Sequence, residues 1–335
     1  MRKLWMSLVS VALVLALAAA VLQVRQGETA SRSAAGVTIE SGNPDEAVAV
    51  GELTELEVAG KVSQLAALLH LEPTDPVIDS VTKGVIPGLA GRELDQEAAV
   101  AEIMAADRDS LLKPKMRDLE PQSLWEYSKY PIYQGNPAKK QIALVINVAW
   151  GNKELVEMLS ILDQADVRAS FFLVGRWAAK NPDLVQRIAA AGHEFGNHAY
   201  SDPHLPKLSA AEIAAEITRT SEVITQITGQ PVHFFSPPYN DFNQTVLDTA
   251  ADLGYLTVLC SLDTADWMRP GVLRIVQRIV PKAHAGAIVL MHPTEQTPAA
   301  LGPIIEGLRQ QGYELVPVSE LLSPVPGGRL TKPGE

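Results

Sequence analysis

Short runs of apolar residues alternate with segments of helical periodicity through the C-terminal half of the chain. An uninterrupted apolar run of five or so residues is typical of a buried parallel strand, because both faces of such a strand are covered. The predicted strands are residues 142–146, 170–174, a stretch running into Gly196-Asn197, 233–235, 255–260, 287–291 and 314–316. Repeated strand and helix units of this kind predict a parallel sheet or a βα barrel.

The helices between these strands carry recognisable start signals. Asn181-Pro182 predicts a helix start, in which the Asn181 side chain accepts a hydrogen bond from the first turn and Pro182 withholds no donor that the helix needs. Ser209 followed by Glu212 predicts a capping box. Further helices are expected near residues 243–253, 271–280 and 299–311.

The N-terminus has the pattern of an export signal. Arg2 and Lys3 precede an uncharged apolar run over residues 4–24, about the 20 residues that span a bilayer as a helix. Residues 1–25 are therefore expected to be a signal anchor or, with Ala18-Ala19-Ala20 as the cleavage site, a signal peptide. The first alternative predicts a single-pass membrane protein with its N-terminus inside and its bulk outside, and the second predicts a secreted protein.

The segment before the alternating region divides into three parts. Residues 26–46 are rich in small and polar residues and predict a linker. Residues 47–110 carry two helical patterns, with Val58, Val62, Leu65 and Leu69 on one face of the first and residues 95–106 forming the second, and they predict a small α+β module. Residues 111–140 predict a connector to the domain at 141–323, and residues 324–335 form a tail.

Composition narrows the class of function. The formal net charge is −11 and the pI is about 5.2, which excludes nucleic acid as the expected partner and favours a neutral substrate. Cys260 is the single cysteine, so the chain has no internal disulfide and no redox motif. It lies in an apolar run and is expected to be a packing residue.

Five predicted strand ends carry polar or aromatic residues, and in a βα barrel the chemistry collects at such ends. These ends are 147–151, 198–204, 236–240, 263–267 and 290–292. The second end is the richest in ligand-type side chains, because His198, Asp202 and His204 fall within seven residues. The sequence therefore predicts either a site for one divalent metal there or, as the alternative, a polar turn.

The order and spacing of these five segments resemble the polysaccharide deacetylases, carbohydrate esterase family 4 (CE4), over about residues 141–322. The resemblance implies a distorted (β/α) barrel with the nodulation-type deacetylase homology. It also implies metal-dependent hydrolysis, with zinc or a similar ion, of N-acetyl groups on chitin oligomers, peptidoglycan or acetylated xylan. Trp150-Gly151 further resembles a branch of exported, sporulation-associated proteins. Residues 86–95 resemble small modules that precede cell-wall-acting domains, and an arbitrary spacer is the alternative.

The resemblance fails on the side of the site that activates water. Asn147 and Val148 stand where the family has a basic aspartate and a metal-binding aspartate. An amide cannot take a proton from water at neutral pH, and valine offers a metal no ligand atom. Asp202 stands at the family's second metal histidine, and Ser236 replaces the arginine that pairs with the base. The anion and its balancing cation are thus lost together, which leaves neither as an unpaired buried charge.

The acid side of the family's site is intact. The resemblance assigns His292 as the general acid for the leaving amine and Asp266 as the carboxylate that orients it. Tyr239 matches the residue whose backbone N–H stabilises the oxyanion. Trp267 and Leu290 match groups that shape the substrate groove and the pocket for the acetyl methyl group.

Three functions stay open on the sequence alone. In the first, His198, Asp202 and His204 form a rearranged metal site and the protein hydrolyses the N-acetyl amide of a cell-envelope amino-sugar polymer. In the second, the protein has no metal, binds an N-acetylated glycan and catalyses nothing. In the third, the domain is a structural scaffold at the envelope.

Overall fold

The computed structural model describes residues 37–39, 48–50, 55–106, 111–113 and 115–334. The predicted signal segment at 4–24 and most of the predicted linker at 26–46 lie outside these residues. Among the described residues, no helix has both the length and the apolar character needed to cross a membrane. The chain divides into two compact units, residues 1–69 with 94–115 and residues 70–93 with 116–335.

The first unit has a short sheet and two helices. Its strands are β1 (Val37–Ile39), β2 (Val48–Val50) and β6 (Leu111–Leu112), in the order β2-β1-β6. Helix α2 (Glu55–Leu69) buries Val58, Val62 and Leu65, three of the four residues expected on one face. Helix α3 (Gln96–Ala105) begins where Asp95 caps it, because the Asp95 side chain accepts from the Ala98 N–H. The range 70–93, which the sequence groups with this module, belongs to the second unit.

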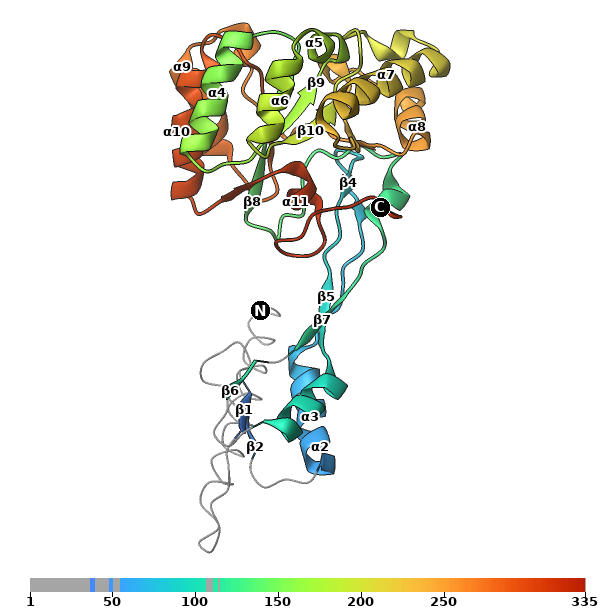
Figure 1. The fold of residues 1–335 in the computed structure, drawn as a ribbon, viewed down its shortest axis with the longest axis vertical. Helices are drawn as coiled ribbons and strands as arrows, with labels where there is room; N and C mark the ends of the chain where they lie inside the picture. The colour runs from blue at the N-terminus through green and yellow to red at the C-terminus, as the bar shows by residue number, and fades with distance from the viewer. Residues whose placement is uncertain (1–36, 40–47, 51–54, 107–110, 114, 335) are drawn as a thin grey trace, which may run out of the picture. The chain divides into compact units, whose positions relative to one another are not determined.

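The second unit is built on an eight-stranded sheet in which every pairing is parallel (Figure 1). Its strands are β8 (Gln141–Val148), β9 (Ser170–Leu173), β10 (Glu194–Asn197), β11 (Phe234–Phe235), β12 (Leu256–Thr257), β13 (Leu262–Asp263), β14 (Ile288–Met291) and β15 (Glu314–Val316). The order is β12-β11-β10-β9-β8-β14-β13, and β15 pairs with the start of β8. The α/β class is confirmed, and the sheet is a curled, open one whose edges are β12 and β13.

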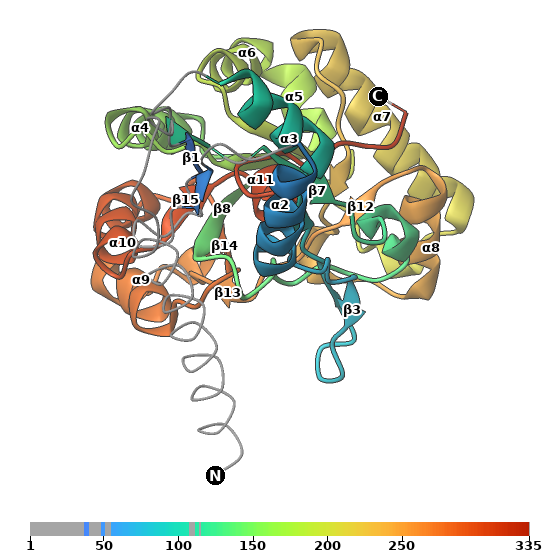
Figure 2. The ribbon, with the colours of Figure 1, turned by 90° about the horizontal axis from the view of Figure 1, so that it is seen from below.

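The helices of this unit surround the strands, as the view along the sheet shows (Figure 2). They are α4 (Asn152–Gln164), α5 (Gly175–Lys180), α6 (Pro182–Ala190), α7 (Ala210–Thr228), α8 (Gln244–Asp252), α9 (Val272–Ile279) and α10 (Thr297–Gln310). The short helix α11 (Val318–Leu322) lies near the middle of that view instead. The predicted capping box of Ser209 and Glu212 is present at the start of α7. Shorter strands β3 (Val77–Ile78), β4 (Val85–Ile86), β5 (Gly91–Leu94) and β7 (Met116–Leu119) form two-stranded pairs, β3 with β4 and β5 with β7.

Strand β8 separates two apolar cores. Ile146 and Val148 belong to the cluster under helices such as α4 and α10, whereas Ala143 and Val145 belong to the cluster on the inner side of the curl. Trp125 and Tyr127 of the predicted connector pack against the inner cluster, so this segment covers part of the sheet. The side chain of Asn147 follows Ala143 and Val145 in the two-residue alternation of a strand, which directs it to the inner side.

One helix start differs from expectation. Pro182 is the first residue of α6, as predicted, but the Asn181 side chain makes no capping hydrogen bond. Its Oδ1 accepts from the Asn152 amide at 2.7 Å and its Nδ2 donates to the Trp177 carbonyl at 2.8 Å. Asn181 therefore links α6 to α4 and α5, because partners from neighbouring helices satisfy its amide before the first turn can.

Candidate functional site

The carboxyl ends of the strands surround a cavity of about 430 Å³. Its walls are Asn147, Ala149, Trp150, His198, Asp202, Tyr239, Asn240, Asp263, Trp267, Leu290 and His292. These residues come from all five of the predicted strand ends. The rings of His198 and His292 therefore lie on one shared hollow, as the sequence predicts.

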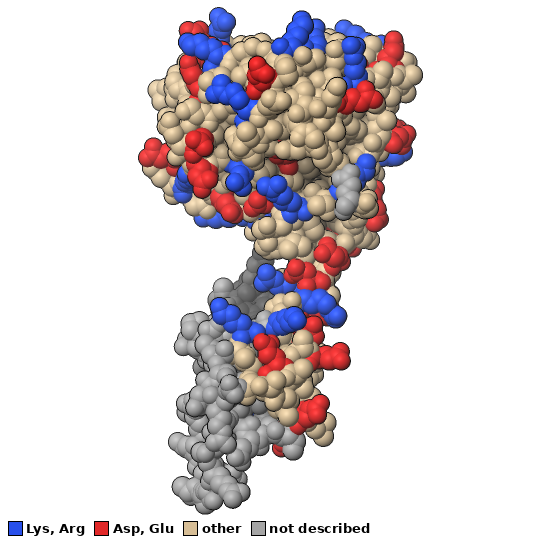
Figure 3. Space-filling model, in the orientation of Figure 1, with Lys and Arg blue, Asp and Glu red and all other residues tan. Residues whose placement is uncertain are grey.

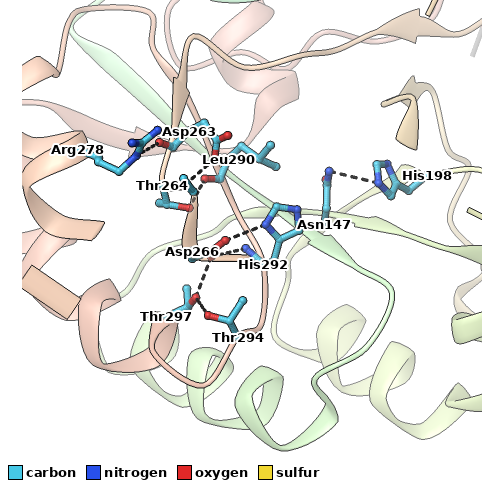
Figure 4. A network of polar contacts seen from close by, with 11 residues as sticks. Asn147, His198, Asp263, Thr264, Asp266, Arg278, Leu290, His292, Thr294 and Thr297 are labelled. Carbon is cyan, nitrogen blue, oxygen red and sulfur yellow. Dashed lines mark hydrogen bonds and ion pairs between the residues drawn. The ribbon is translucent and has the colours of Figure 1, made fainter. Parts of the chain in front are cut away.

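Asp266 and His292 form a buried dyad at one wall (Figure 4). The Asp266 side chain is 0% exposed, and its Oδ1 accepts from His292 Nδ1 at 2.9 Å. Its Oδ2 accepts from the His292 backbone N–H at 2.7 Å and from Thr297 Oγ1 at 2.8 Å. Because Asp266 fixes the proton on Nδ1, the Nε2 atom of a neutral His292 is left as an acceptor.

Trp150 covers one face of this imidazole. The ring centroids of Trp150 and His292 are 5.9 Å apart and the planes are 7° from parallel. The next residue, Gly151, has φ +81° and packs so closely on Pro293 that a Cβ there would lie 2.0 Å from the Pro293 carbonyl oxygen. Only glycine fits this turn, and the turn places Trp150 over His292.

On the opposite wall, Asn147 and His198 are hydrogen-bonded to each other (Figure 4). His198 Nδ1 lies 2.7 Å from the Ser236 carbonyl oxygen and donates to it. His198 Nε2 therefore carries a lone pair, which accepts from Asn147 Nδ2 at 3.4 Å. Asn147 is 4% exposed, and its Oδ1 has no hydrogen-bond partner within the described residues.

Burial controls the charge of His198. The side chain is 6% exposed, and desolvation is the main reason that its pKa falls to about 4. His292 lowers the pKa of His198 further, whereas Asp202 and the bond to Ser236 raise it. His198 is neutral at neutral pH, so the wall adds no positive charge.

Val148 and Ser236 stand where the resemblance places a metal-binding aspartate and an arginine, and both are buried. Val148 is 0% exposed and belongs to the helix-side core cluster. Ser236 is 3% exposed and contributes its backbone carbonyl to His198. Neither side chain supplies a charge to the cavity.

The predicted metal set His198, Asp202 and His204 is not formed. His204 is not a cavity residue; its ring stacks on Tyr239 with centroids 4.5 Å apart, and its Nδ1 lies 2.9 Å from Asp241 Oδ2. Asp202 lines the cavity, and its Oδ2 accepts from the Tyr239 hydroxyl at 3.2 Å. Asp241, an exposed carboxylate on the next strand-end segment, holds His204 away from His198, and sequence spacing does not show that pairing.

Tyr239 and the residues near it have unusual backbone geometry. Tyr239 has φ +61° and Asn240 has φ +52°, in the left-handed region that non-glycine residues rarely adopt. Asp202 shares this conformation with φ +60°. Such backbone strain is characteristic of functional loops. Tyr239 is 61% exposed and lines the cavity, so it lies at the rim.

Thr294 and Thr297 are functional residues that the sequence analysis missed. Thr297 Oγ1 donates to Asp266 and lies 2.7 Å from Thr294 Oγ1 (Figure 4). Both follow His292 closely in the chain. The sequence does not show whether a threonine near a helix start donates to a distant carboxylate or caps the helix. Asn240 and Asp263 also line the cavity and had no assigned role.

Fold and site together define a class of protein. A curled parallel sheet that carries an Asp–His dyad and a strained tyrosine at its carboxyl end is the architecture that the resemblance to the polysaccharide deacetylases predicts. Residues 134–258 match the family model for polysaccharide deacetylase.

Comparison with known proteins agrees. The chain is 37% identical over 268 residues to the uncharacterised protein YlxY of Bacillus subtilis, covering 77% of this chain and 81% of YlxY. It is 37% identical over 172 residues to a peptidoglycan-N-acetylglucosamine deacetylase of Bacillus cereus, covering 50% of this chain and 80% of that enzyme. This chain belongs to the CE4 polysaccharide deacetylase family.

Among solved structures, BA3943 of Bacillus anthracis is similar over most of the chain. It has a TM-score of 0.68 and 37% identity, and the match covers 80% of this chain and 95% of BA3943. BA3943 is described as a CE4 family pseudoenzyme, and the structure of a BA3943 mutant with restored enzymatic activity has the same TM-score of 0.68.

CE4 deacetylases generally depend on a metal ion, and the residues present here do not fit one. The described part of the chain has no group of three or more His, Cys, Asp or Glu side chains placed to hold a metal. The lone pair of His198 that faces the cavity accepts from Asn147, and Val148 has no ligand atom. No step of a mechanism can therefore be derived through a metal at this site.

Proposed function

We propose that this protein binds the N-acetyl group of a cell-envelope amino-sugar polymer in the cavity and does not hydrolyse it. The observation that carries the proposal is the contact between Asn147 and His198. It fills the place of the family's base and metal with a neutral hydrogen bond, while leaving the Asn147 Oδ1 acceptor without a partner in the described part of the chain.

The cavity offers a match for each part of an acetamide. Asn147 Oδ1 and His292 Nε2 can each accept a hydrogen bond from the acetamide N–H. Because a ligand acetamide has one N–H, it bonds to one of these two acceptors. Leu290, 6% exposed, is an apolar wall for the methyl group. The resemblance assigns the Tyr239 backbone N–H to the carbonyl oxygen. Trp150 and Trp267, 49% and 57% exposed, offer ring faces on which a sugar can stack.

The absence of a base is the reason that binding stops short of reaction. Water attacks an amide only when a group removes its proton or a metal lowers its pKa. Asn147 can do neither. Asp202 also lines the cavity, and its Oδ2 already accepts from the Tyr239 hydroxyl.

Hydrolysis of the N-acetyl amide is the second candidate, and the intact Asp266–His292 pair is the observation that favours it. Relatives with this fold include peptidoglycan-N-acetylglucosamine deacetylases. If the protein is active, His292 protonates the leaving nitrogen and Asp266 orients His292. A structural scaffold is a third candidate, and the open cavity with its partnerless acceptor does not support it.

The test combines calorimetric titration of the full chain with N-acetylglucosamine oligomers and an assay for released acetate. Saturable binding without acetate release is the expected result. Trp267→Ala should weaken binding by up to about tenfold, since stacking on one ring contributes on the order of 0.5–1.5 kcal/mol. Leu273→Ala is the matched control, because Leu273 is 68% exposed and does not line the cavity.

Two results would replace the proposal. Acetate release that disappears in His292→Ala would establish a hydrolase. If the oligomers neither bind nor lose acetate, the structural scaffold is the remaining function. The wild-type protein should also be assayed with added zinc, because zinc binding would support metal-dependent hydrolysis.

We also propose that the protein acts outside the cytoplasmic membrane, either held there by residues 4–24 or released by cleavage. The proposal is supported by the basic and apolar pattern of the N-terminus. Fractionation of cells that express the full chain tests it: material in the cytosol with an uncleaved N-terminus would contradict export.

A further inference from the structure

A second hollow lies at the other end of the sheet. It has a volume of about 490 Å³, and its walls include the residues that begin β10 and β11 and those that precede β9. In a parallel sheet these amino ends are opposite to the carboxyl ends that surround the glycan cavity. The described residues of this hollow share no member with that cavity.

Two buried polar atoms on this hollow lack partners. His193 is 3% exposed and Ser319 is 6% exposed, and neither His193 Nε2 nor Ser319 Oγ has a hydrogen-bond partner within the described residues. The Ala169 backbone N–H donates to His193 Nδ1 at 3.2 Å. Burial lowers the pKa of His193 to about 4, so the ring is neutral and its proton lies on Nε2. The hollow thus has one unused donor, the His193 Nε2–H, which is costly to bury without an acceptor. The Ser319 hydroxyl lies close enough to Glu194 to lower the pKa of that carboxyl.

Two guanidinium groups add positive charge to the same walls. Arg168 and Arg329 line the hollow, and neither has an ion pair or hydrogen bond among the described residues. Arg168 lies near His193 and lowers its pKa, and Arg329 lies near Glu194 and lowers the pKa of that carboxyl. Both guanidinium groups therefore act on buried side chains that line the hollow.

Glu194 is the acidic residue of the hollow, and it is already satisfied. Its Oε2 accepts from Ser170 Oγ at 2.7 Å and from the Ser319 backbone N–H at 3.2 Å. Burial is the largest influence on Glu194 and raises its pKa. The walls of the hollow therefore carry two fixed positive charges and at most one negative charge, and Asp163, which does not line the hollow, raises the pKa of His193. Figure 3 shows that acidic and basic side chains are interspersed over the face of the molecule drawn there.

We propose that this hollow is a binding site for a phosphate group. Its donors come from four separate segments: the turn before β9, the start of β10, helix α11 and the C-terminal tail. A tetrahedral phosphate presents oxygens in several directions and can accept from all of them, whereas a planar carboxylate presents two oxygens in one plane. Arg168 and Arg329 bind the charge, and His193 Nε2–H and Ser319 Oγ–H complete the set of donors.

The test is calorimetric titration of the full chain with inorganic phosphate, with glycerophosphoglycerol as a phosphodiester, and with acetate, at constant ionic strength. Saturable binding of a phosphate compound, tighter than that of acetate, is expected. The double variant Arg168→Gln and Arg329→Gln should weaken it at least about tenfold, because each charge-assisted hydrogen bond is worth about 1.5 kcal/mol or more. Arg187→Gln, an exposed arginine of α6 outside the hollow, should leave it unchanged.

The outcomes separate the sources of the ligand and the failure of the proposal. Tighter binding of the diester assigns the site to a phosphodiester polymer, and tighter binding of inorganic phosphate assigns it to the free ion. Equal binding of acetate, absence of saturation, or an unaffected double variant would overturn the site. Ser319→Ala should also weaken binding without unfolding the protein. Glycan binding uses other residues, so neither result for this hollow changes that proposal.

Discussion

The side-chain nitrogen of Asn147 lies 3.4 Å from Nε2 of His198, so an amide occupies the imidazole lone pair that faces the cavity. The oxygen of the same amide, Asn147 Oδ1, is buried and accepts no hydrogen bond from any described residue. The side of the site that activates water in the family is thus replaced by a neutral pair, and the opposite Asp–His dyad is retained. Four predictions follow from these contacts and from those around them.

Restoring the family's residues should create metal binding and activity. In the combined variant Asn147→Asp, Val148→Asp, Asp202→His and Ser236→Arg, zinc should raise the midpoint of thermal unfolding and acetate release should appear. Without metal the variant should be less stable than wild type, because Val148 is 0% exposed in an apolar core and a carboxylate there is costly. BA3943 provides a precedent, as a mutant of that pseudoenzyme has restored activity. Adding His292→Ala to the combined variant should abolish the release; acetate release by the unaltered protein at a similar rate would contradict the argument.

Asp266→Asn should destabilise the protein by about 2–4 kcal/mol. The Asp266 carboxylate accepts three hydrogen bonds while 0% exposed, and an amide would turn one of its oxygens into a donor that faces other donors. Urea unfolding measures the loss. Asp241→Asn is the control, since its side chain is 41% exposed and its partner His204 lies on the surface, and it should cost less than about 1 kcal/mol. Equal losses of unfolding free energy in the two variants would show that the buried dyad stabilises the fold no more than the surface pair does.

Gly151→Ala should cost more than about 3 kcal/mol and should displace Trp150 from His292. The residue has φ +81°, and the added Cβ would lie 2.0 Å from the Pro293 carbonyl oxygen. Gly302→Ala in α10 is the control, because no described atom outside its chain neighbours and its own helix backbone lies within 4 Å of its Cβ position, and alanine favours a helix. Thermal unfolding and tryptophan fluorescence report the two effects, and a Gly151→Ala protein as stable as Gly302→Ala would refute the close packing of this turn.

Acid should destabilise the protein between about pH 6.5 and pH 4. His193 and His198 have folded-state pKa values of about 4, against 6.5 as the ordinary value, because burial disfavours the charged ring. Below pH 6.5 the unfolded chain takes up protons that the folded chain refuses, so the free energy of unfolding falls as the pH falls. Each residue contributes up to about 3 kcal/mol to this loss.

The variant His193→Gln isolates one of these contributions. Glutamine can accept from the Ala169 N–H but cannot titrate, so the loss of stability from pH 7 to pH 4.5 should be smaller than in wild type. Urea unfolding at the two pH values measures it. His70→Gln is the control, since His70 is a partly exposed histidine with an exposed partner, Glu72. A decline of the same size in His193→Gln as in wild type would exclude His193 as a source of the acid sensitivity.

Much of this architecture could be predicted because its signals are local. The apolar runs became strands β8, β9, β14 and β15, and the Ser209–Glu212 capping box and Pro182 began their helices as expected. A local signal depends on residues within a turn or two of chain, which the sequence places together directly. The shared cavity of His198 and His292 follows from the same logic, since the carboxyl ends of parallel strands meet at one edge.

The failures all involve partners that are distant in the sequence. His204 was expected beside His198 and instead pairs with Asp241, and Asn181 was expected to cap α6 and instead bonds to Asn152. Thr297 was not foreseen as a partner of Asp266. In each case several nearby groups compete for one polar side chain, and packing between elements decides which of them wins.

The amino-acid sequence by itself determined that the C-terminal half is a parallel α/β domain of the deacetylase family whose basic aspartate and metal aspartate are gone. Only the tertiary structure decided what stands in their place: a hydrogen bond between Asn147 and His198, a valine turned into the helix-side core, and a histidine held at the surface. Residue identity is a property of the chain, but the direction of a side chain and the partner it finds depend on which strands and loops pack together, and those contacts join residues far apart along the sequence.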